Sequence, residues 1–339
     1  MKICFISGHK NPGQCGITDN VELIAKKMDN LGQEIVQYFI QKDLGDLSDL
    51  PEADLYSIQF APYAFANNGF PNQILKCLAE KLQNKKVHLN FHEIWVGAYP
   101  RANCKEKGIG WLQKNLILRF INKCKPAWVT SSNAAALDRL KQEGVPAIFL
   151  YLFGNIPYSE NSKPTTKGQM LKVAFFGTLY ADFPYDKLGK FFSTLSKTSG
   201  KKLEIILIGR QREDAGSNYL YSMCKKNEFL IERTGELSTN LISEQLQKCS
   251  LCICTTPYDV IGKSSATAAM LEHGLPVLAY DDGDTPQESL FIPDPFKDQI
   301  FLINDHSSVE KLLQYIEKPR KSFFDGVAHT ANKMLELVS

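Results

Sequence analysis

The sequence lacks any apolar run that approaches the roughly 20 residues needed to cross a membrane, so a transmembrane helix is not expected. A secretory leader is not expected either, because the first residues, MKICFISG, pass directly into an expected strand and a Gly-rich loop. An excess of charge of one sign is also missing: 39 Lys and Arg residues balance 37 Asp and Glu residues, for a formal net charge of +2. This balance does not indicate a nucleic-acid partner.

A disulfide framework is not indicated. The nine cysteines are an odd number and are scattered through apolar stretches such as KICFI and LCICT, which suits a reducing compartment. Cys249, Cys252 and Cys254 have the spacing of metal ligands, but no second cluster follows, so no metal site is predicted. We therefore expect a cytoplasmic protein.

Length and composition favour an ordinary globular protein of two domains. The chain has 339 residues, of which 44% are hydrophobic and 22% charged. Since one domain usually holds about 100–200 residues, two domains are expected.

Strands and helices alternate along the whole chain. A helix is predicted around residues 18–31, and a linker rich in Ser, Thr, Pro, Lys and Gly is predicted over 152–170. The predicted strands span 2–7, 34–40, 55–60, 87–92, 127–132 and 147–152 before this linker, and 171–177, 202–209, 229–235, 251–256 and 276–280 after it.

This alternation predicts an α/β fold with two doubly wound Rossmann-like domains that face each other across a cleft. We expect the first domain over residues 1–160, the second over 161–320 and a C-terminal helix over 321–339. Ligands of such sheets bind beyond the carboxyl ends of the strands. The loops expected on this side begin at Gly8, His92, Gly154, Gly177, Gly209, Gly235 and Pro257.

The segment GKSSATAAMLEHGLPVLA, residues 262–279, begins with a candidate anion site. It follows one predicted strand and leads into another, with a short helix between them. A Walker A loop would need glycine where Pro257 stands, so the segment does not indicate a P-loop nucleoside triphosphatase. The free amides and dipole of a helix N-terminus suit a diphosphate. The competing interpretation is a serine-capped helix with a solvent-facing lysine.

The order of short motifs along the chain resembles that of the GT-B glycosyltransferases, and most closely family 4 of these enzymes. The similar segments are GQCGITDNVELIAKKMDNLGQEIV, LYSIQFAPYAFANNGFP, LNFHEIW, LYLFGNIP, FFGTLY, LIGRQ, RTGELS and residues 262–279. The resemblance implies a hexosyltransferase that moves a sugar from a nucleotide-sugar, such as a UDP-sugar, to a sugar, lipid-linked or small-molecule acceptor in polysaccharide or glycolipid synthesis. It also implies retention of the anomeric configuration, no cofactor and no metal.

The resemblance assigns the donor to one set of residues. Gly262 would allow close approach of the backbone to the diphosphate, Ser264 and Ser265 would donate from their hydroxyls, and Lys263 would add a charge. Gly16 would let its loop crowd the diphosphate. Arg210 is a further candidate cation, with a surface arginine as the alternative, and Lys187 is a weaker one.

Two departures from the family pattern leave other functions open. Ile261 and Ala269 stand where the family carries two glutamates that hold donor hydroxyls, and Glu272 does not simply replace the second of them. Thr178 stands where the family often has a phosphate-binding arginine. The alternatives are a non-catalytic GT-B relative that binds a sugar or a partner enzyme, and a GT-B sugar-nucleotide epimerase.

The resemblance assigns the reaction centre to His92, at a predicted strand end beside Glu93. A histidine there can donate to a sugar hydroxyl or move a proton, and the alternative is a structural hydrogen bond. Asp19 and Asn20 are candidates for contact with the acceptor, and the alternative is that they cap the first helix.

Two further stretches have competing interpretations. The basic stretch 101–128, with Trp111 and Leu112, is either a helix that lies on anionic lipid, giving peripheral contact with the inner membrane face, or a packed helix with one buried apolar stripe. Asp282 and Asp284 match the Asp-x-Asp pattern of metal-binding transferases, but their sequence context favours a polar turn.

Overall fold

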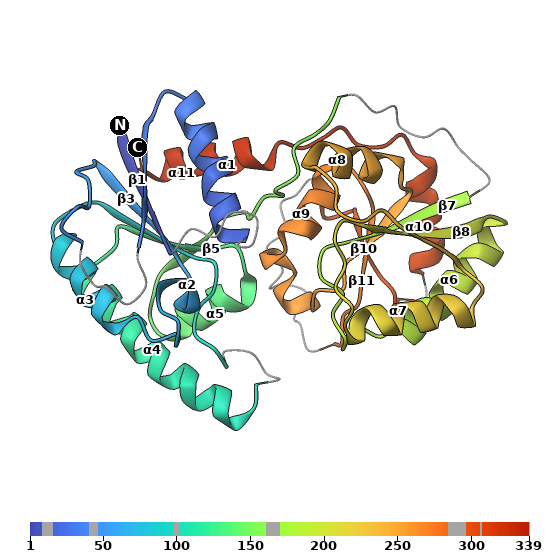
Figure 1. Cartoon of the computed structure of the whole chain (residues 1–339), viewed down its shortest axis with the longest axis horizontal. Coiled ribbons are helices and arrows are strands. Elements are labelled where there is room, and N and C mark those ends of the chain that lie inside the picture. Colours follow the sequence, from blue (N-terminus) through green and yellow to red (C-terminus); the bar gives the residue numbers. More distant parts are fainter. Residues whose placement is uncertain are drawn as a thin grey trace. The chain divides into compact units, whose positions relative to one another are not determined.

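The computed structural model describes residues 1–8, 16–40, 47–97, 102–160, 170–283, 296–305 and 307–338. The expected linker at 161–169, the loop at 9–15 and Asp284 lie outside these residues. The chain forms two compact units (Figure 1). Unit 1 comprises Met1–Tyr151 and Val327–Ser339, and unit 2 comprises Leu152–Gly326.

Unit 1 is built on a six-stranded parallel sheet with the order β2-β1-β3-β4-β5-β6. Its strands are β1 (Lys2–Ser7), β2 (Glu34–Phe39), β3 (Leu55–Phe60), β4 (Val87–Phe91), β5 (Trp128–Ser131) and β6 (Ala147–Phe149). Its helices are α1 (Gly16–Asn30), α2 (Pro62–Phe65), α3 (Asn72–Lys81), α4 (Cys104–Cys124), α5 (Ala134–Gln142) and α11 (Gly326–Val338). The six strands predicted in this half are confirmed.

One face of this sheet is apolar and forms the main core of unit 1. Tyr56, Ile58 and Phe60 alternate along β3 and are buried with residues of α3 and α4. Phe60 packs edge-on against Phe91 of β4, with ring centroids 5.5 Å apart. Burial of such large rings contributes roughly 1.5–3 kcal/mol each to the stability of the unit. The opposite face of the same strands is buried as well, but it carries polar side chains.

The end of the chain belongs to unit 1. The hydroxyl of Thr330 in α11 donates to the carbonyl oxygen of Tyr151 at 2.9 Å, and the Lys86 ammonium donates to the carbonyl of Val338 at 2.6 Å. The unit boundaries therefore fall at Tyr151 and Gly326, whereas the sequence suggested residues 160 and 320 and a separate terminal helix.

Unit 2 holds a second six-stranded parallel sheet, with the order β12-β11-β10-β7-β8-β9. Its strands are β7 (Met170–Phe176), β8 (Lys202–Ile208), β9 (Leu230–Arg233), β10 (Leu251–Ile253), β11 (Val277–Ala279) and β12 (Ile300–Leu302). Its helices are α6 (Tyr185–Ser199), α7 (Ala215–Lys226), α8 (Thr239–Lys248), the 3-10 segment η1 (Tyr258–Lys263), α9 (Ser265–Glu272) and α10 (Ser308–Glu317). Strand β12 was not predicted, because three residues are too few to show a period.

Glu272, at the end of α9, holds both segments through which the chain passes between the units. Its side chain is only 1% exposed and accepts the Gly154 amide at 2.9 Å. Its carbonyl oxygen accepts the Phe324 amide, also at 2.9 Å. Gly154 belongs to this contact rather than to an open strand-end loop: a Cβ added there would lie 2.5 Å from the Ala269 Cα.

We predict that Glu272→Ala lowers the free energy of unfolding of unit 2 by about 1–3 kcal/mol, because the buried Gly154 amide loses its acceptor. Urea unfolding monitored by circular dichroism measures this. Glu310→Ala, at an exposed position of α10, is the control and should change the stability by less than about 0.5 kcal/mol. Equal stability of the two variants would contradict the assigned role of Glu272.

Candidate functional site

The second buried face of the unit 1 sheet carries a cluster of polar side chains. They come from alternate positions of three neighbouring strands and from the residue that follows β4, and they are Ser57, Gln59, His88, Asn90, His92 and Thr130. Polar groups on a buried sheet face destabilise a fold unless each one finds a partner. In this cluster every member has one.

Five of these side chains form a closed ring of hydrogen bonds. Because the Asn90 Oδ1 can only accept, the Thr130 hydroxyl donates to it, and the His88 Nε2–H then donates to Thr130. The Ser57 hydroxyl donates to the His88 Nδ1 at 2.9 Å. The Gln59 amide group closes the ring by donating to Ser57 and accepting from the Asn90 Nδ2, both at 2.8 Å. Each member of the ring therefore donates to the next one.

The ring determines which ring nitrogen of His92 carries the proton. The His92 Nε2 lies 2.8 Å from the Gln59 Oε1, which can only accept, and 3.3 Å from the Asn90 Nδ2, which can only donate. The contact with Gln59 is much the shorter, so we assign the proton to Nε2, which donates to Gln59. The Nδ1 is then the basic nitrogen, and it has no partner among the described residues. Burial lowers the pKa values of both His92 and His88 to about 4. For His88, the nearby His92 lowers the pKa further because two positive charges would repel each other. At neutral pH His92 is thus a neutral hydrogen-bond acceptor.

The sequence contained a signal for this ring that we did not use. Strands of a parallel sheet that is covered on both faces usually read as continuous apolar runs. Here Ser57 and Gln59 interrupt one predicted strand at a spacing of two, and His88, Asn90 and His92 interrupt the next. Polar residues with this period on neighbouring parallel strands predict one shared polar face.

The other residues expected on the acceptor side lie at the same sheet or on the helix that follows β1. Glu93 is exposed, next to His92, whose amide donates to the Phe60 carbonyl oxygen at 3.0 Å. Helix α1 begins at Gly16, so Asp19 and Asn20 lie within it and are not its N-cap. Asn20 is 5% exposed, and its Nδ2 has no acceptor in the described parts of the chain. A Cβ added to Gly16 would meet nothing within 4 Å, so the fold itself does not require glycine there.

We predict that both imidazoles stay neutral down to a pH of about 4. In the unfolded chain they protonate near pH 6.5. The unfolded state therefore binds more protons between these values, and the stability of unit 1 should fall as the pH drops from about 6.5 to about 4, by up to about 1.4 kcal/mol per pH unit for each histidine. Nitrogen-15 NMR of the ring nitrogens, with His92→Gln used to assign its signals, measures both pKa values. Titration of His92 near 6.5 would contradict the ring.

In unit 2 the chain order of the strands reverses between β7 and β10, which is where ligands of doubly wound sheets bind. The loops that follow these two strands are in contact. The Thr255 hydroxyl donates to the Thr178 carbonyl oxygen, with the two oxygens 2.6 Å apart. Gly177 has a φ of +98°, and a Cβ there would lie 2.8 Å from that of Ala266 in the first turn of α9. The start of α9 is thus held at the reversal point.

The start of α9 carries the residues expected to bind the donor. Ser264 is its N-cap and accepts the Thr267 amide at 3.2 Å. The amides of Ser265 and Ala266 have no acceptor among the described residues, and both residues are only partly buried. Gly262 and Lys263 end the preceding segment η1, where the sequence had suggested a simple turn. Two free amides on a helix dipole form an arrangement that favours an anion.

The candidate cations differ in their surroundings. Arg210 follows β8, the neighbour of β7, and is exposed without a partner in the described structure. Lys187 donates to the Tyr280 hydroxyl at 2.7 Å and lies over its ring. Lys187 is therefore already engaged, which leaves Arg210 as the stronger candidate.

The positions of the two missing glutamates are apolar and buried. Ile261 is 5% exposed and Ala269 is fully buried. Glu272 faces the connecting segments, as shown above, so it does not take over the second position. At the other candidate motif, the Asp281 side chain accepts the Gly283 amide at 3.0 Å, and Gly283 has a φ of +89°. This is a polar turn up to residue 283.

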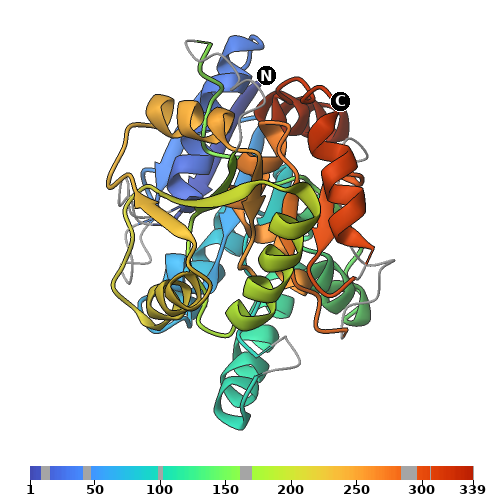
Figure 2. The same ribbon diagram turned by 90° about the vertical axis from the view of Figure 1, so that its right-hand side faces the viewer.

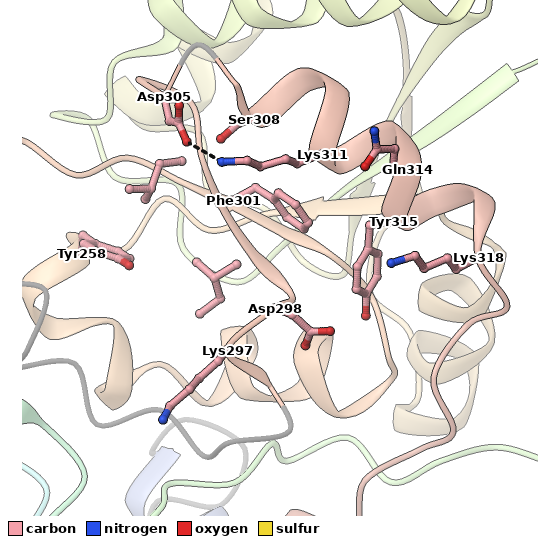
Figure 3. A pocket seen from close by; sticks show the side chains of 12 residues that line it. Tyr258, Lys297, Asp298, Phe301, Asp305, Ser308, Lys311, Gln314, Tyr315 and Lys318 are labelled. Carbon is pink, nitrogen blue, oxygen red and sulfur yellow. Dashed lines mark ion pairs between the residues drawn. The ribbon is translucent and has the colours of Figure 1, made fainter.

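A hollow of about 590 Å³ lies beside β12 and α10 (Figure 3). Phe301 and Tyr315 pack edge to face on its wall, and Lys311 pairs with Asp305 at 3.6 Å. Among the described residues of the loops expected on the functional side, Tyr258, after β10, is the one that lines it. Its Asp298 pairs with Lys321, and its described lining contains none of the residues expected to bind the donor.

The chain was compared with known proteins. No protein-family model and no curated protein matches the sequence. Solved structures do match over nearly the whole chain. A protein of Listeria monocytogenes described as a UDP-N-acetylglucosamine 2-epimerase matches with a TM-score of 0.58 and 10% identity, covering 99% of this chain and 95% of its own.

Two further structures are similar. The UDP-GlcNAc 2-epimerase of Methanocaldococcus jannaschii has a TM-score of 0.55 and 10% identity, covering 100% of this chain and 99% of its own. The Anabaena protein HepE, solved with UDP and glucose, has a TM-score of 0.54 and 16% identity, with the same coverage. At these identities the likeness concerns the fold alone. The chain has the GT-B fold of two Rossmann-like units, as the sequence predicted.

No helix in the described part of the chain is both long enough and apolar enough to cross a membrane.

Proposed function

We propose that the protein is a glycosyltransferase that uses a nucleotide-sugar, with a UDP-sugar as the first donor to test. The observation that carries this proposal is the hydrogen-bond ring that presents the neutral His92 Nδ1 as an acceptor at a strand end. A sugar hydroxyl is the natural donor for such a nitrogen. Asn20, with its buried and unpartnered amide group, supports a polar ligand on the same unit.

The start of α9 supplies what the leaving nucleotide requires. The amides of Ser265 and Ala266 suit one phosphate, and Lys263 and Arg210 add positive charge. When the bond between the sugar C1 and the diphosphate oxygen breaks, negative charge grows on that oxygen, and fixed dipoles and cations stabilise it. The acceptor oxygen forms the new bond to C1. Its proton passes to the departing diphosphate, so no protein nucleophile is needed. Retention of configuration, implied by the family resemblance, is part of this proposal.

The second candidate is an epimerase, and two of the similar structures carry that name. Inversion at C2 of a sugar requires removal of a hydrogen from carbon and its return to the other side. This needs a group with a high proton affinity. Burial lowers the pKa of His92 to about 4, so His92 is a weak base. Its Nε2 also already donates to Gln59. These properties favour hydroxyl binding over proton abstraction from carbon.

The third candidate is a non-catalytic binding protein, which Ile261 and Ala269 favour because they remove two carboxylates expected to hold the donor. The three candidates differ in their products. A transferase releases UDP only when an acceptor is present, an epimerase forms an isomeric UDP-sugar without releasing UDP, and a binding protein does neither.

We predict that loss of either donor-side cation weakens the binding of UDP by about 1–3 kcal/mol, as expected for a charged hydrogen bond. Isothermal calorimetry of Lys263→Ala and of Arg210→Gln measures this. Arg212→Gln is the matched control, because Arg212 is also exposed and lies two residues further along the same loop. Unchanged affinity in both variants would contradict the donor site at α9.

We predict that His92→Ala lowers turnover at least about 100-fold while the affinity for UDP stays within a factor of about two, because His92 acts on a hydroxyl and not on the diphosphate. Turnover is followed as UDP release from a panel of UDP-sugars with glycan and lipid extracts as acceptors. Addition of excess EDTA should leave the rate unchanged, since amides and cations already neutralise the diphosphate. Formation of an isomeric UDP-sugar without UDP release would support the epimerase instead.

A further inference from the structure

Helix α4 has one buried stripe, formed by Gly110, Gln113, Ile117, Phe120 and Cys124, but not every apolar residue that the sequence suggested for this stripe belongs to it. Ile117 and Phe120 are buried as expected, but Trp111 is 61% exposed and Leu112 is 49% exposed. The amino-terminal end of the helix extends beyond the neighbouring helices of unit 1 in both views (Figures 1 and 2). Two large apolar side chains are therefore exposed on a projecting helix.

The charges on the exposed side of α4 are of one sign. Successive residues of a helix are about 100° apart around its axis. Viewed down this axis, an arc of about 160° contains, in order, Lys107, Trp111, Arg119, Leu112 and Lys105. None of these three cations has an ion pair with a described residue. The one carboxylate of α4, Glu106, lies on the far side and is held in the capping box of the helix, where its side chain accepts the Asn103 amide at 2.8 Å. On this side α4 carries cations and no carboxylate of its own, and Lys123, which lies at the same angle as Lys105, pairs with Glu80 of α3 at 3.0 Å.

A hollow of about 380 Å³ adjoins this side, between the first half of α4 and the end of α5. Trp111 and Lys107 form part of its wall, together with Lys114, Arg139 and Glu143. Glu143, the one carboxylate among the described residues of this wall, pairs with Lys114 at 2.8 Å. Three cations and one carboxylate leave an excess of two positive charges around a space large enough for a phosphate group.

We propose that the exposed side of α4 docks on the surface of a bilayer that contains anionic phospholipid. An indole ring is best accommodated at the boundary between lipid and water, where its apolar body and polar N–H both find partners. Lysine and arginine beside it gain from the negative potential of anionic headgroups. The cations on the exposed side of α4 are complementary in charge to such a surface.

A protein partner fits these observations less well. A stable protein interface buries about 800 Å² on each side, and its centre contains few charged residues. Here two apolar side chains stand among unpaired cations, which is the composition of a helix that lies on a membrane surface. The proposal is independent of the transferase reaction, because it concerns the lipid surface and not the sugar.

The test is co-sedimentation of the full chain with two sets of vesicles, one of phosphatidylcholine alone and one with about a third phosphatidylglycerol. We expect binding to the anionic vesicles only, and weaker binding as the salt concentration rises. Trp111→Ala with Leu112→Ala should weaken it at least about tenfold, because apolar burial is lost. Replacing Lys105, Lys107 and Arg119 together by Gln should weaken vesicle binding about 100-fold, because each cation increases the affinity by on the order of fivefold.

Matched control variants lie in unit 2. Tyr219→Ala with Leu241→Ala removes two equally exposed apolar side chains, and Gln at Lys190, Lys197 and Lys225 removes three exposed cations. Both should bind as the parent does. In the parent, tryptophan emission should shift to shorter wavelength on anionic vesicles, and Trp111→Phe should abolish the shift. Circular dichroism checks that each variant is folded.

Three outcomes would overturn the proposal: no binding at low salt, equal binding to both kinds of vesicle, or loss of binding in the unit 2 controls to the same extent as in the α4 variants.

Discussion

The polar face of the unit 1 sheet is acceptable only because its hydrogen bonds close into a ring. Each buried donor or acceptor left without a partner would destabilise the fold by about 1–3 kcal/mol. Within the ring Ser57, His88, Thr130, Asn90 and Gln59 each use their donors on the next member. The ring therefore has one direction, and removing any member leaves two others unsatisfied.

This constraint reaches the candidate site through one contact. The Gln59 oxygen already accepts from Asn90, and it accepts from the His92 Nε2 as well. If the imidazole of His92 turned over, the lone pair of its basic nitrogen would point at a lone pair of the Gln59 oxygen, and the two would repel each other. A histidine held this way presents one lone pair in one direction. Such pre-organisation is what a site needs to orient a hydroxyl without reorganising during the reaction.

In unit 2 the buried carboxylate of Glu272 has a structural role. Glu272 stands three residues after Ala269, one of the two positions at which the family resemblance implied a donor-binding glutamate, yet it accepts the Gly154 amide and its own carbonyl accepts the Phe324 amide. Its carboxylate thus orders the connecting segments. In unit 2 this buried carboxylate serves the chain path, whereas the buried ring of unit 1 serves the candidate site.

Much of the fold could be predicted from the sequence alone, because local periodicity determines it. The strands around 2–7 and 202–208 are recognisable because apolar runs that end at a glycine need no long-range contact to be identified. The βα repetition also predicts doubly wound sheets, but it was the strand order in the structure that placed the start of α9 at the reversal point.

The tertiary structure decided what side chains face. Ser57, Asn90 and Thr130 lie on three different strands, and only the parallel register brings them together into a ring. Trp111 and Ile117 are both apolar residues of one helix, and only the packing of α4 against its unit buries one and exposes the other. A sequence specifies which residues share a face, but burial depends on what other elements cover that face, and this is a property of contacts between distant segments.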